Sequence, residues 1–291
     1  MRATAALFLL ALATPSIADK PKAHLGLPYA ATNNARQTLD VYTPAAGKNL
    51  PVVVYIHGGG WQAGDKSEVH KKPQAFADRG FVFVSINYRL LPEATIKQMA
   101  QDVAKAIRWV HDHAKDYGGD PDTMVVMGHS AGAQLAALVC TDERYLKAEG
   151  LPLDPIRGCV PIDGDTYDVV MQIKTVEPVD AKRAERFRIK FGDEKMQVEL
   201  SATTHVAKGK NIPPFLFLHV ADHPETKGQA LRLVKLLQDA GVPAKAYPAQ
   251  GKTHDTLNND LGVAGDLPTQ ELFSFVGEVL NKHGLRGLKE E

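Results

Sequence analysis

Apolar and polar positions change along the chain in blocks of two kinds. Continuous runs rich in β-branched residues, such as 51–56 and 81–86, predict strands that are buried on both faces. Between these runs, the pattern of 71–79 predicts a short helix. Apolar residues spaced three and four positions apart between Ile96 and Ala114 predict a longer amphipathic helix. Strand and helix therefore alternate from early in the chain.

The alternation continues towards the C-terminus. Further strands are predicted at 124–127, 158–162, 215–219 and 244–247, and further helices at 131–139, 225–240 and 270–282. An extended stretch that contains 38–42 precedes the alternation. This order favours the α/β class, with a mostly parallel central sheet and helices on both faces. Residues from about 165 to 210 interrupt the order, because they are charged and helical in pattern with no strand signal. We expect a single domain over 19–291, with a cap-like insertion at about 165–210.

The first 18 residues have a pattern of their own. Arg2 precedes the apolar stretch 5–13, and Pro15 and small residues up to Ala18 follow it. This arrangement is typical of a cleavable signal peptide, so we expect a secreted or periplasmic protein. A membrane-spanning helix needs about 20 apolar residues, and this stretch is about half as long, so stable membrane insertion is not expected.

Charge and cysteine content add little to this picture. The chain has 34 basic and 34 acidic residues, which gives no reason to expect a nucleic-acid partner. Its oligomeric state is left open. An exported protein could join Cys140 to Cys159 by a disulfide, but the apolar neighbours of both favour two buried free thiols. Arg89 and Asp102, charged among apolar neighbours, predict a structural ion pair.

The strongest chemical signal is the pentapeptide Gly128-His129-Ser130-Ala131-Gly132. It lies between a predicted strand and a helix rich in small residues, which is the context of a nucleophile elbow. The sharp turn needs small neighbours, and it places the Ser130 hydroxyl at a helix N-terminus, where backbone amides stabilise negative charge. The motif therefore predicts Ser130 as a nucleophile.

A second signal is His57-Gly58-Gly59-Gly60-Trp61, directly after a predicted strand. Consecutive glycines let the backbone approach a ligand and turn its N–H groups towards it. An oxyanion needs such donors, and we expect them from Gly59, Gly60 and Ala131, with Gly58 as an alternative. A phosphate-binding loop is disfavoured, because both the Gly-x-Gly-x-x-Gly spacing and a P-loop Lys-Ser/Thr are missing.

These two motifs, together with Asn87-Tyr88-Arg89-Leu90 and Pro92-Glu93, resemble the hormone-sensitive-lipase and arylformamidase-like branch of the α/β-hydrolases. The resemblance covers nearly the whole mature chain. The segment 57–66, with its Gly64-Asp65-Lys66 ending, is most similar to small bacterial acetyl-xylan and feruloyl esterases. The resemblance implies the chain order Ser, Asp, His, an acyl-enzyme intermediate, and neither metal nor cofactor.

In that order, Asp222 is the expected acid, because it follows the strand at 215–219 where open α/β sheets place their sites. Family members often show His-Gly-x-x-Asp at this place, and this chain has Val220 instead of the Gly. Other acids near predicted strand ends are Glu225, the fallback, and Asp163 and Asp165, which precede the insertion.

His254 is the expected base, because among the 11 histidines it has the required order and lies in a loop after the last short strand. Trp61, His129 and Tyr167 are candidate substrate-binding residues, although Trp61 fits a packing role equally well.

These residues favour a serine hydrolase of small or aromatic carboxylic esters. Arylformamidase-type amide hydrolysis is the alternative, since the same triad serves both reactions. A non-catalytic binding protein is disfavoured because Ser130, an acid and His254 are all present. A lipase is disfavoured because 175–200 is dominated by charged residues. Export would favour environmental esters, such as acetyl or feruloyl groups on polysaccharide.

Overall fold

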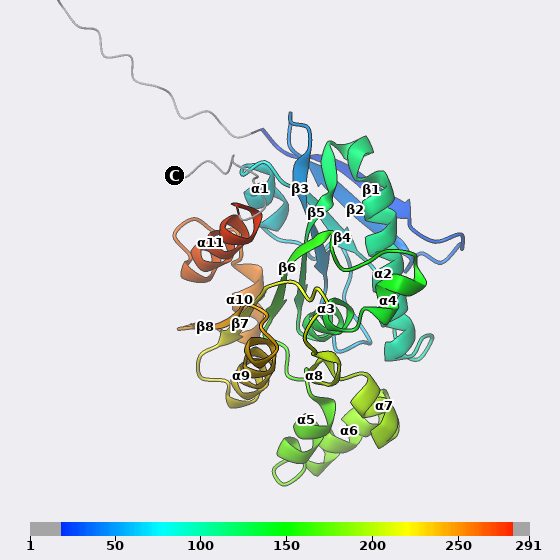
Figure 1. The fold of residues 1–291 in the computed structure, drawn as a ribbon, viewed down its shortest axis with the longest axis vertical. Coiled ribbons are helices and arrows are strands. Elements are labelled where there is room, and N and C mark those ends of the chain that lie inside the picture. The colour runs from blue at the N-terminus through cyan, green and yellow to red at the C-terminus, as the bar shows by residue number, and fades with distance from the viewer. Residues whose placement is uncertain (1–18, 282–291) are drawn as a thin grey trace, which may run out of the picture.

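The structure, a computed structural model, describes residues 19–281. The expected signal peptide at 1–18 lies outside the described residues. The centre of the fold is an eight-stranded sheet in the order β1-β2-β4-β3-β5-β6-β7-β8 (Figure 1). The strands are β1 (Lys22–Pro28), β2 (Thr38–Thr43), β3 (Leu50–Ile56), β4 (Val82–Ile86), β5 (Gly119–His129), β6 (Ile156–Ile162), β7 (Phe215–Val220) and β8 (Ala244–Ala249).

The sheet is antiparallel only where β2 pairs with β1 and β4, and every other pairing is parallel. The central strands are buried on both faces, as their continuous apolar runs predict. Along β3, for example, Val52 and Val54 pack into one core cluster, whereas Val53 and Tyr55 pack into the cluster on the other face. The predicted α/β class with a mostly parallel sheet is confirmed.

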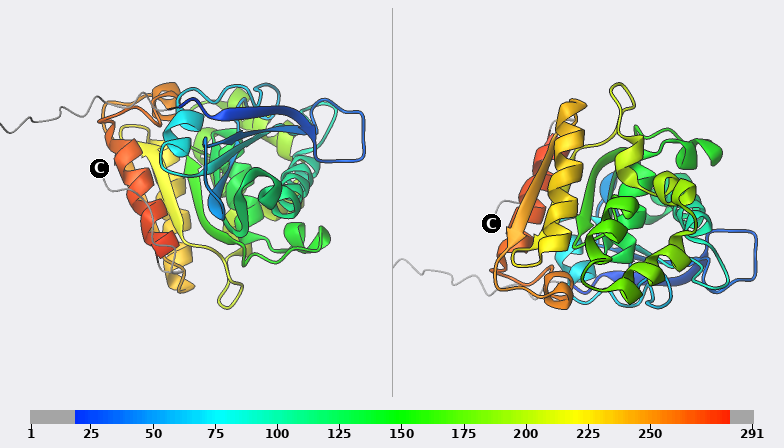
Figure 2. Two further views of the ribbon diagram at one scale, coloured as in Figure 1. Left: turned by 90° about the horizontal axis from the view of Figure 1, so that it is seen from above. Right: turned by 90° about the horizontal axis from the view of Figure 1, so that it is seen from below.

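Helices cover both faces of the sheet (Figure 2). The helices α2, α3 and α9 pack with the first cluster, and α1, α10 and α11 lie with the second. The helical elements are α1 (Lys72–Ala77), α2 (Ile96–His113), η1 (Ala114–Tyr117, a 3₁₀ turn), α3 (Ala131–Thr141), α4 (Arg144–Ala148), α5 (Val169–Val176), α6 (Ala181–Phe191), α7 (Glu194–Glu199), α8 (Ala202–His205), α9 (Pro224–Asp239), α10 (His254–Asn259) and α11 (Leu267–Asn281).

Four of these helices, α5 to α8, occupy the connection between β6 and β7 where the sequence pattern is interrupted. Figure 1 shows α5, α6 and α7 grouped together beyond one end of the sheet. Two polar side chains of α6 join this group to the body: Lys190 donates to the Gly60 carbonyl at 3.1 Å, and Arg183 pairs with Asp165 and Glu225. Within residues 19–281, no helix has the length and apolar character needed to cross a bilayer.

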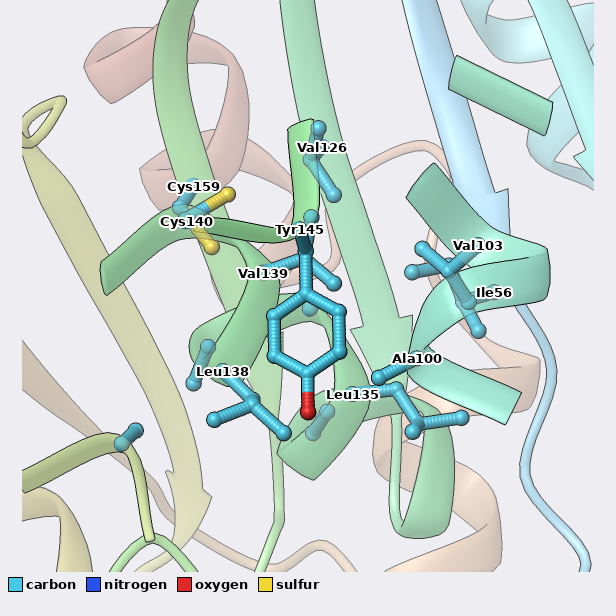
Figure 3. Close-up of a cluster of buried hydrophobic side chains, with 14 of the residues drawn as sticks. Ile56, Ala100, Val103, Val126, Leu135, Leu138, Val139, Cys140, Tyr145 and Cys159 are labelled. Carbon is cyan, nitrogen blue, oxygen red and sulfur yellow. The ribbon is translucent and has the colours of Figure 1, made fainter. Parts of the chain in front are cut away.

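The helix α3 is buried along its whole length, which its small residues allow. Figure 3 shows its surroundings, including Cys140 on α3 and Cys159 on β6. Both cysteines are buried and free, as predicted. Arg89 and Asp102 form the predicted ion pair, with two guanidinium nitrogens 2.7 and 2.8 Å from the carboxylate oxygens.

Candidate active site

Ser130 stands at the turn between β5 and α3, at the C-terminal edge of the sheet. Its backbone has φ 55° and ψ −118°, a region that non-glycine residues rarely adopt and that costs free energy. The turn can close because Gly128 has no side chain: a Cβ there would lie 2.2 Å from the Gly132 carbonyl oxygen. The Ser130 amide donates to the Ile162 carbonyl at 2.9 Å, which fixes the turn against β6.

The glycine loop after β3 lies beside this turn. A Cβ on Gly58 would approach the Ser130 Cβ to 3.1 Å, and one on Gly59 would lie 2.1 Å from the Ala63 carbonyl oxygen. Gly59 and Gly60 have φ of 119° and 60°, conformations that glycine adopts without strain. Ala131 begins α3, so its amide has no intrahelical acceptor. The loop and the helix start therefore bring backbone donors next to Ser130.

Ser130 and His254 both line a pocket of about 490 Å³. Glycines of the loop and His129 form part of its wall. Its lining residues are Tyr55, His57, Gly58, Gly59, Gly60, Glu68, His70, His129, Ser130, His254, Asp255, Asn258 and Asn259. Of the sequence-predicted residues, Ser130, His254, His129 and the three glycines thus share one pocket.

His254, the first residue of α10, contacts Asp163 rather than Asp222. Its Nδ1 lies 2.7 Å from Oδ2 of Asp163, whose side chain is fully buried at the end of β6. The other carboxylate oxygen, Oδ1, accepts from the Val220 amide at 2.9 Å. The end of β7 therefore supports a carboxylate from β6 instead of supplying one itself.

The expectation that Asp222 is the partner of His254 is wrong. Asp222 is exposed in the turn after β7. A His-Gly-x-x-Asp motif that starts at His219 would place its Asp at 223, where this chain has His223. The His223 side chain accepts from the Thr226 amide and caps α9. The fallback Glu225 is also excluded as the partner, because it pairs with Arg183 of α6.

The contact between His254 and Asp163 shifts both pKa values. The hydrogen bond that His254 donates to Asp163 outweighs burial and holds the pKa of His254 above its ordinary 6.5. Burial alone would raise the pKa of Asp163, but hydrogen bonds from His254, the Val220 amide and the Thr226 side chain hold it below 3.8. The Asp163 carboxylate therefore stabilises the protonated, cationic form of the His254 imidazole.

His129 is buried between the glycine loop and His254. Its Nε2 lies 3.1 Å from the His254 carbonyl oxygen, and the two rings are 4.5 Å apart. Burial lowers the pKa of His129 to about 3, so the ring is neutral at physiological pH. A neutral ring with a proton on Nε2 donates to that carbonyl.

Two of the predicted substrate-binding residues do not line the pocket of Ser130. Trp61 is 4% exposed and packs against Phe191 of α6, with its indole N–H directed to Gln134 at 3.3 Å. Tyr167 is 1% exposed, and its hydroxyl accepts from the Gly164 amide. Both are packing residues, which the large buried area of an aromatic side chain favours.

Sequence reasoning missed the acid and part of the pocket wall. Asp163 directly follows a predicted strand, and this position indicated a possible acid. Asp222 was preferred because Asp163 precedes the insertion in the chain. Tyr55 was not identified as a pocket residue, because it belongs to a buried strand. Asn258 was not identified, because the sequence pattern does not predict the short helix α10. Among residues 19–281, no group of three or more His, Cys, Asp or Glu side chains is arranged to hold a metal ion.

A family model described as BD-FAE matches residues 39–226. A probable isoprenylcysteine alpha-carbonyl methylesterase of Arabidopsis thaliana is 28% identical over 237 residues, which cover 76% of this chain and 49% of that protein. A probable carboxylic ester hydrolase of Mycobacterium tuberculosis is 32% identical over 176 residues, covering 58% and 40%. This chain therefore spans half or less of the length of these two relatives.

Solved structures show the same fold over nearly the whole chain. An esterase from the Planctomycetes species Thermogutta terrifontis has a TM-score of 0.69 and 24% identity, covering 94% of this chain and 96% of its own. Esterase B of Lactobacillus rhamnosis has a TM-score of 0.72 and 21% identity, covering 91% and 90%. At these identities the likeness concerns the fold.

Proposed function

The chain belongs to the BD-FAE family, and on this premise we propose that it is a serine carboxylic-ester hydrolase that forms an acyl-enzyme intermediate. The observation that carries the proposal is the 2.7 Å hydrogen bond between His254 and buried Asp163, at a pocket that Ser130 also lines. The names of the relatives and structural neighbours, which are esterases, support it.

Each side chain has a role in this reaction. Nε2 of His254 removes the proton from Ser130 as its Oγ attacks the ester carbonyl carbon. Asp163 keeps the other imidazole proton on Nδ1 and stabilises the cation. The same histidine then protonates the leaving alcohol, and it activates the water that releases the acid.

Backbone amides of Gly59, Gly60 and Ala131 are the proposed donors to the oxyanion. They are held in place before the reaction starts, by the positive φ values of the loop and by the start of α3. Each such donor contributes on the order of 3–4 kcal/mol to lowering the barrier.

The pocket wall supports small esters with a polar alcohol part. Glu68, His70, Asp255 and Asn259 give it hydrogen-bonding groups around His254. A long apolar chain would leave these groups without partners, which is costly once water is displaced. We therefore propose that the substrates are esters with acetyl, short-chain or aromatic acyl groups. Export through the segment 1–18 is part of this proposal, and it would direct the enzyme to esters outside the cytoplasm.

Hydrolysis rates across a substrate panel test the proposal. The panel contains p-nitrophenyl esters with acyl chains of about two to twelve carbons, methyl ferulate, acetylated xylan and N-formylkynurenine. We expect the highest kcat/KM with short or aromatic acyl esters, and its loss in Ser130→Ala. Full activity in Ser130→Ala would overturn the mechanism. Faster turnover of N-formylkynurenine than of every ester would instead favour a formamidase.

A further inference from the structure

The helix α10 carries His254 as its first residue and is only six residues long. A helix of this length does not form by itself in water, so contacts with the rest of the protein determine its position. At its start, the Thr253 and Thr256 side chains form a capping box, and His129 contacts the His254 carbonyl. In its middle, Leu257 is fully buried.

The end of α10 is held by two polar side chains from other elements. Nζ of Lys72, on α1, donates to the Asn258 carbonyl at 2.8 Å. The Tyr55 hydroxyl, on β3, donates to Oδ1 of the same asparagine at 2.8 Å. A cation at the carbonyl end of a helix is favoured by the helix dipole and by the free carbonyls there.

Lys72 is an unusual residue for this position, because its side chain is fully buried. Its Nζ lies 4.8 Å from the centre of the Tyr55 ring, and within residues 19–281 it forms no ion pair with a carboxylate. Lysine is almost never fully buried without such a pair, because removing the ammonium from water is costly. Burial lowers the pKa of Lys72 to about 7. Packing alone would be better served by an apolar side chain.

We propose that Lys72 is a positioning residue for His254: by holding the end of α10 against β3, it directs the imidazole towards Ser130. Lys72 does not line the pocket, so it acts only through the helix. The inference rests on the proposed function, in which His254 is the base. A small rotation of this short helix about its end would move the imidazole, and displacements of about 1 Å can lower a rate about 100-fold.

The test compares Lys72→Met, which removes the donor and keeps a similar shape, with Lys71→Met, its exposed neighbour on the same turn. We expect Lys72→Met to lower kcat for p-nitrophenyl acetate about 10- to 100-fold, with KM within about twofold. Lys71→Met should match the wild type. The downfield proton resonance of the hydrogen bond between His254 and Asp163 should broaden in Lys72→Met only.

A folded Lys72→Met with wild-type kcat would overturn the proposal, as would an unchanged His254 proton resonance. If this variant does not fold, Lys72→Gln decides, because it keeps a polar side chain at position 72 whose amide is one atom too short to replace the donor to the Asn258 carbonyl. A lower kcat with unchanged KM would support the proposal, and wild-type kcat would overturn it. Failure of the proposed function is distinguishable, because the wild type itself would then show no Ser130-dependent ester hydrolysis.

Discussion

Among single residues, Asp163 is held by contacts on both its side chain and its backbone. Its carboxylate accepts from His254 through one oxygen and from the Val220 amide through the other. Its backbone has φ 49°, and its amide donates to the Leu218 carbonyl at 2.7 Å. The residue is thus fixed by β6 and β7 together, and it can orient the imidazole with little further loss of freedom.

This contact predicts the pH dependence of hydrolysis. The base must be neutral, and the hydrogen bond to Asp163 holds the pKa of His254 above 6.5. We therefore expect the acid limb of kcat/KM to have its midpoint above pH 6.5, and to move to lower pH in Asp163→Asn. The pH profile of kcat/KM for p-nitrophenyl acetate measures both. A wild-type midpoint below pH 6.5, or no movement in the variant, would contradict this.

The same shift has a defined sign for stability. The raised pKa of His254 stabilises the fold while the imidazole is protonated, so the contribution is fully present below pH 6.5 and is lost as pH rises through the folded-state pKa. The lowered pKa of Asp163 acts in the opposite direction, and its contribution is lost as pH falls through the folded-state value.

At the residue scale, the sequence identified the parts that local patterns encode. Ser130 and the glycine loop lie in contiguous motifs whose small residues are required by the geometry of the turn. The acid could not be chosen in this way, because its partner is 91 positions away in the chain. The acid is determined by which strand end lies next to His254, and this depends on how the sheet folds.

At the scale of elements, the elbow depends on close contact between α3 and β3. A Cβ on Gly132 would lie 2.2 Å from the Ile56 carbonyl oxygen, which belongs to the strand that leads into the glycine loop. The helix and the loop can therefore approach only because position 132 has no side chain. This contact holds the start of α3, with the Ala131 amide, next to the start of the glycine loop.

Two glycines in helices give opposite predictions for substitution by alanine. Gly132→Ala should lower the free energy of unfolding by about 1–3 kcal/mol, because backbone must move to admit the methyl group. Gly228→Ala, in α9, has no atom within 4 Å of its Cβ and should raise it by about 0.5–1 kcal/mol. Urea denaturation of both variants measures the difference. Equal effects would show that the elbow is not as tightly packed as described.

Element prediction succeeded where burial leaves a strong pattern and failed where it does not. The central strands are apolar on both faces, so their runs are continuous. The edge strand β1 is mostly exposed, and its sequence, Lys22 to Pro28, has no continuous apolar run. The helix α10 is too short to show a helical period, and side chains from β3 and α1 hold its end in place.

For the whole molecule, two side chains of α6 connect the group of helices between β6 and β7 to the site. Arg183, near the start of α6, bridges Asp165, two residues after the acid in the chain, and Glu225, in the first turn of α9. Lys190, near the end of the same helix, donates to the Gly60 carbonyl in the glycine loop. One helix thus connects the segment that carries Asp163 with the proposed oxyanion donors.

Removal of the first connection should loosen these helices without unfolding the sheet. In Arg183→Met, we expect backbone amides of α5 to α7 to exchange hydrogen about fivefold faster, because hydrogen bonds to partly buried carboxylates are lost. Arg186→Met is the control, because Arg186 is 60% exposed and its ion pair with Asp180 is long, at 3.9 Å. Hydrogen exchange with mass spectrometry compares them. Equal exchange rates would mean that the bridge does not restrain these helices.

The pairing of His254 with Asp163 is tested most directly by two matched variants, Asp163→Asn and Asp222→Asn. Loss of the acid leaves the imidazole in the wrong tautomer, so kcat/KM for p-nitrophenyl acetate should fall on the order of 10³- to 10⁴-fold in Asp163→Asn. Asp222→Asn, at an exposed turn, should remain within about twofold of the wild type. The opposite outcome, with activity lost in Asp222→Asn and kept in Asp163→Asn, would contradict the account.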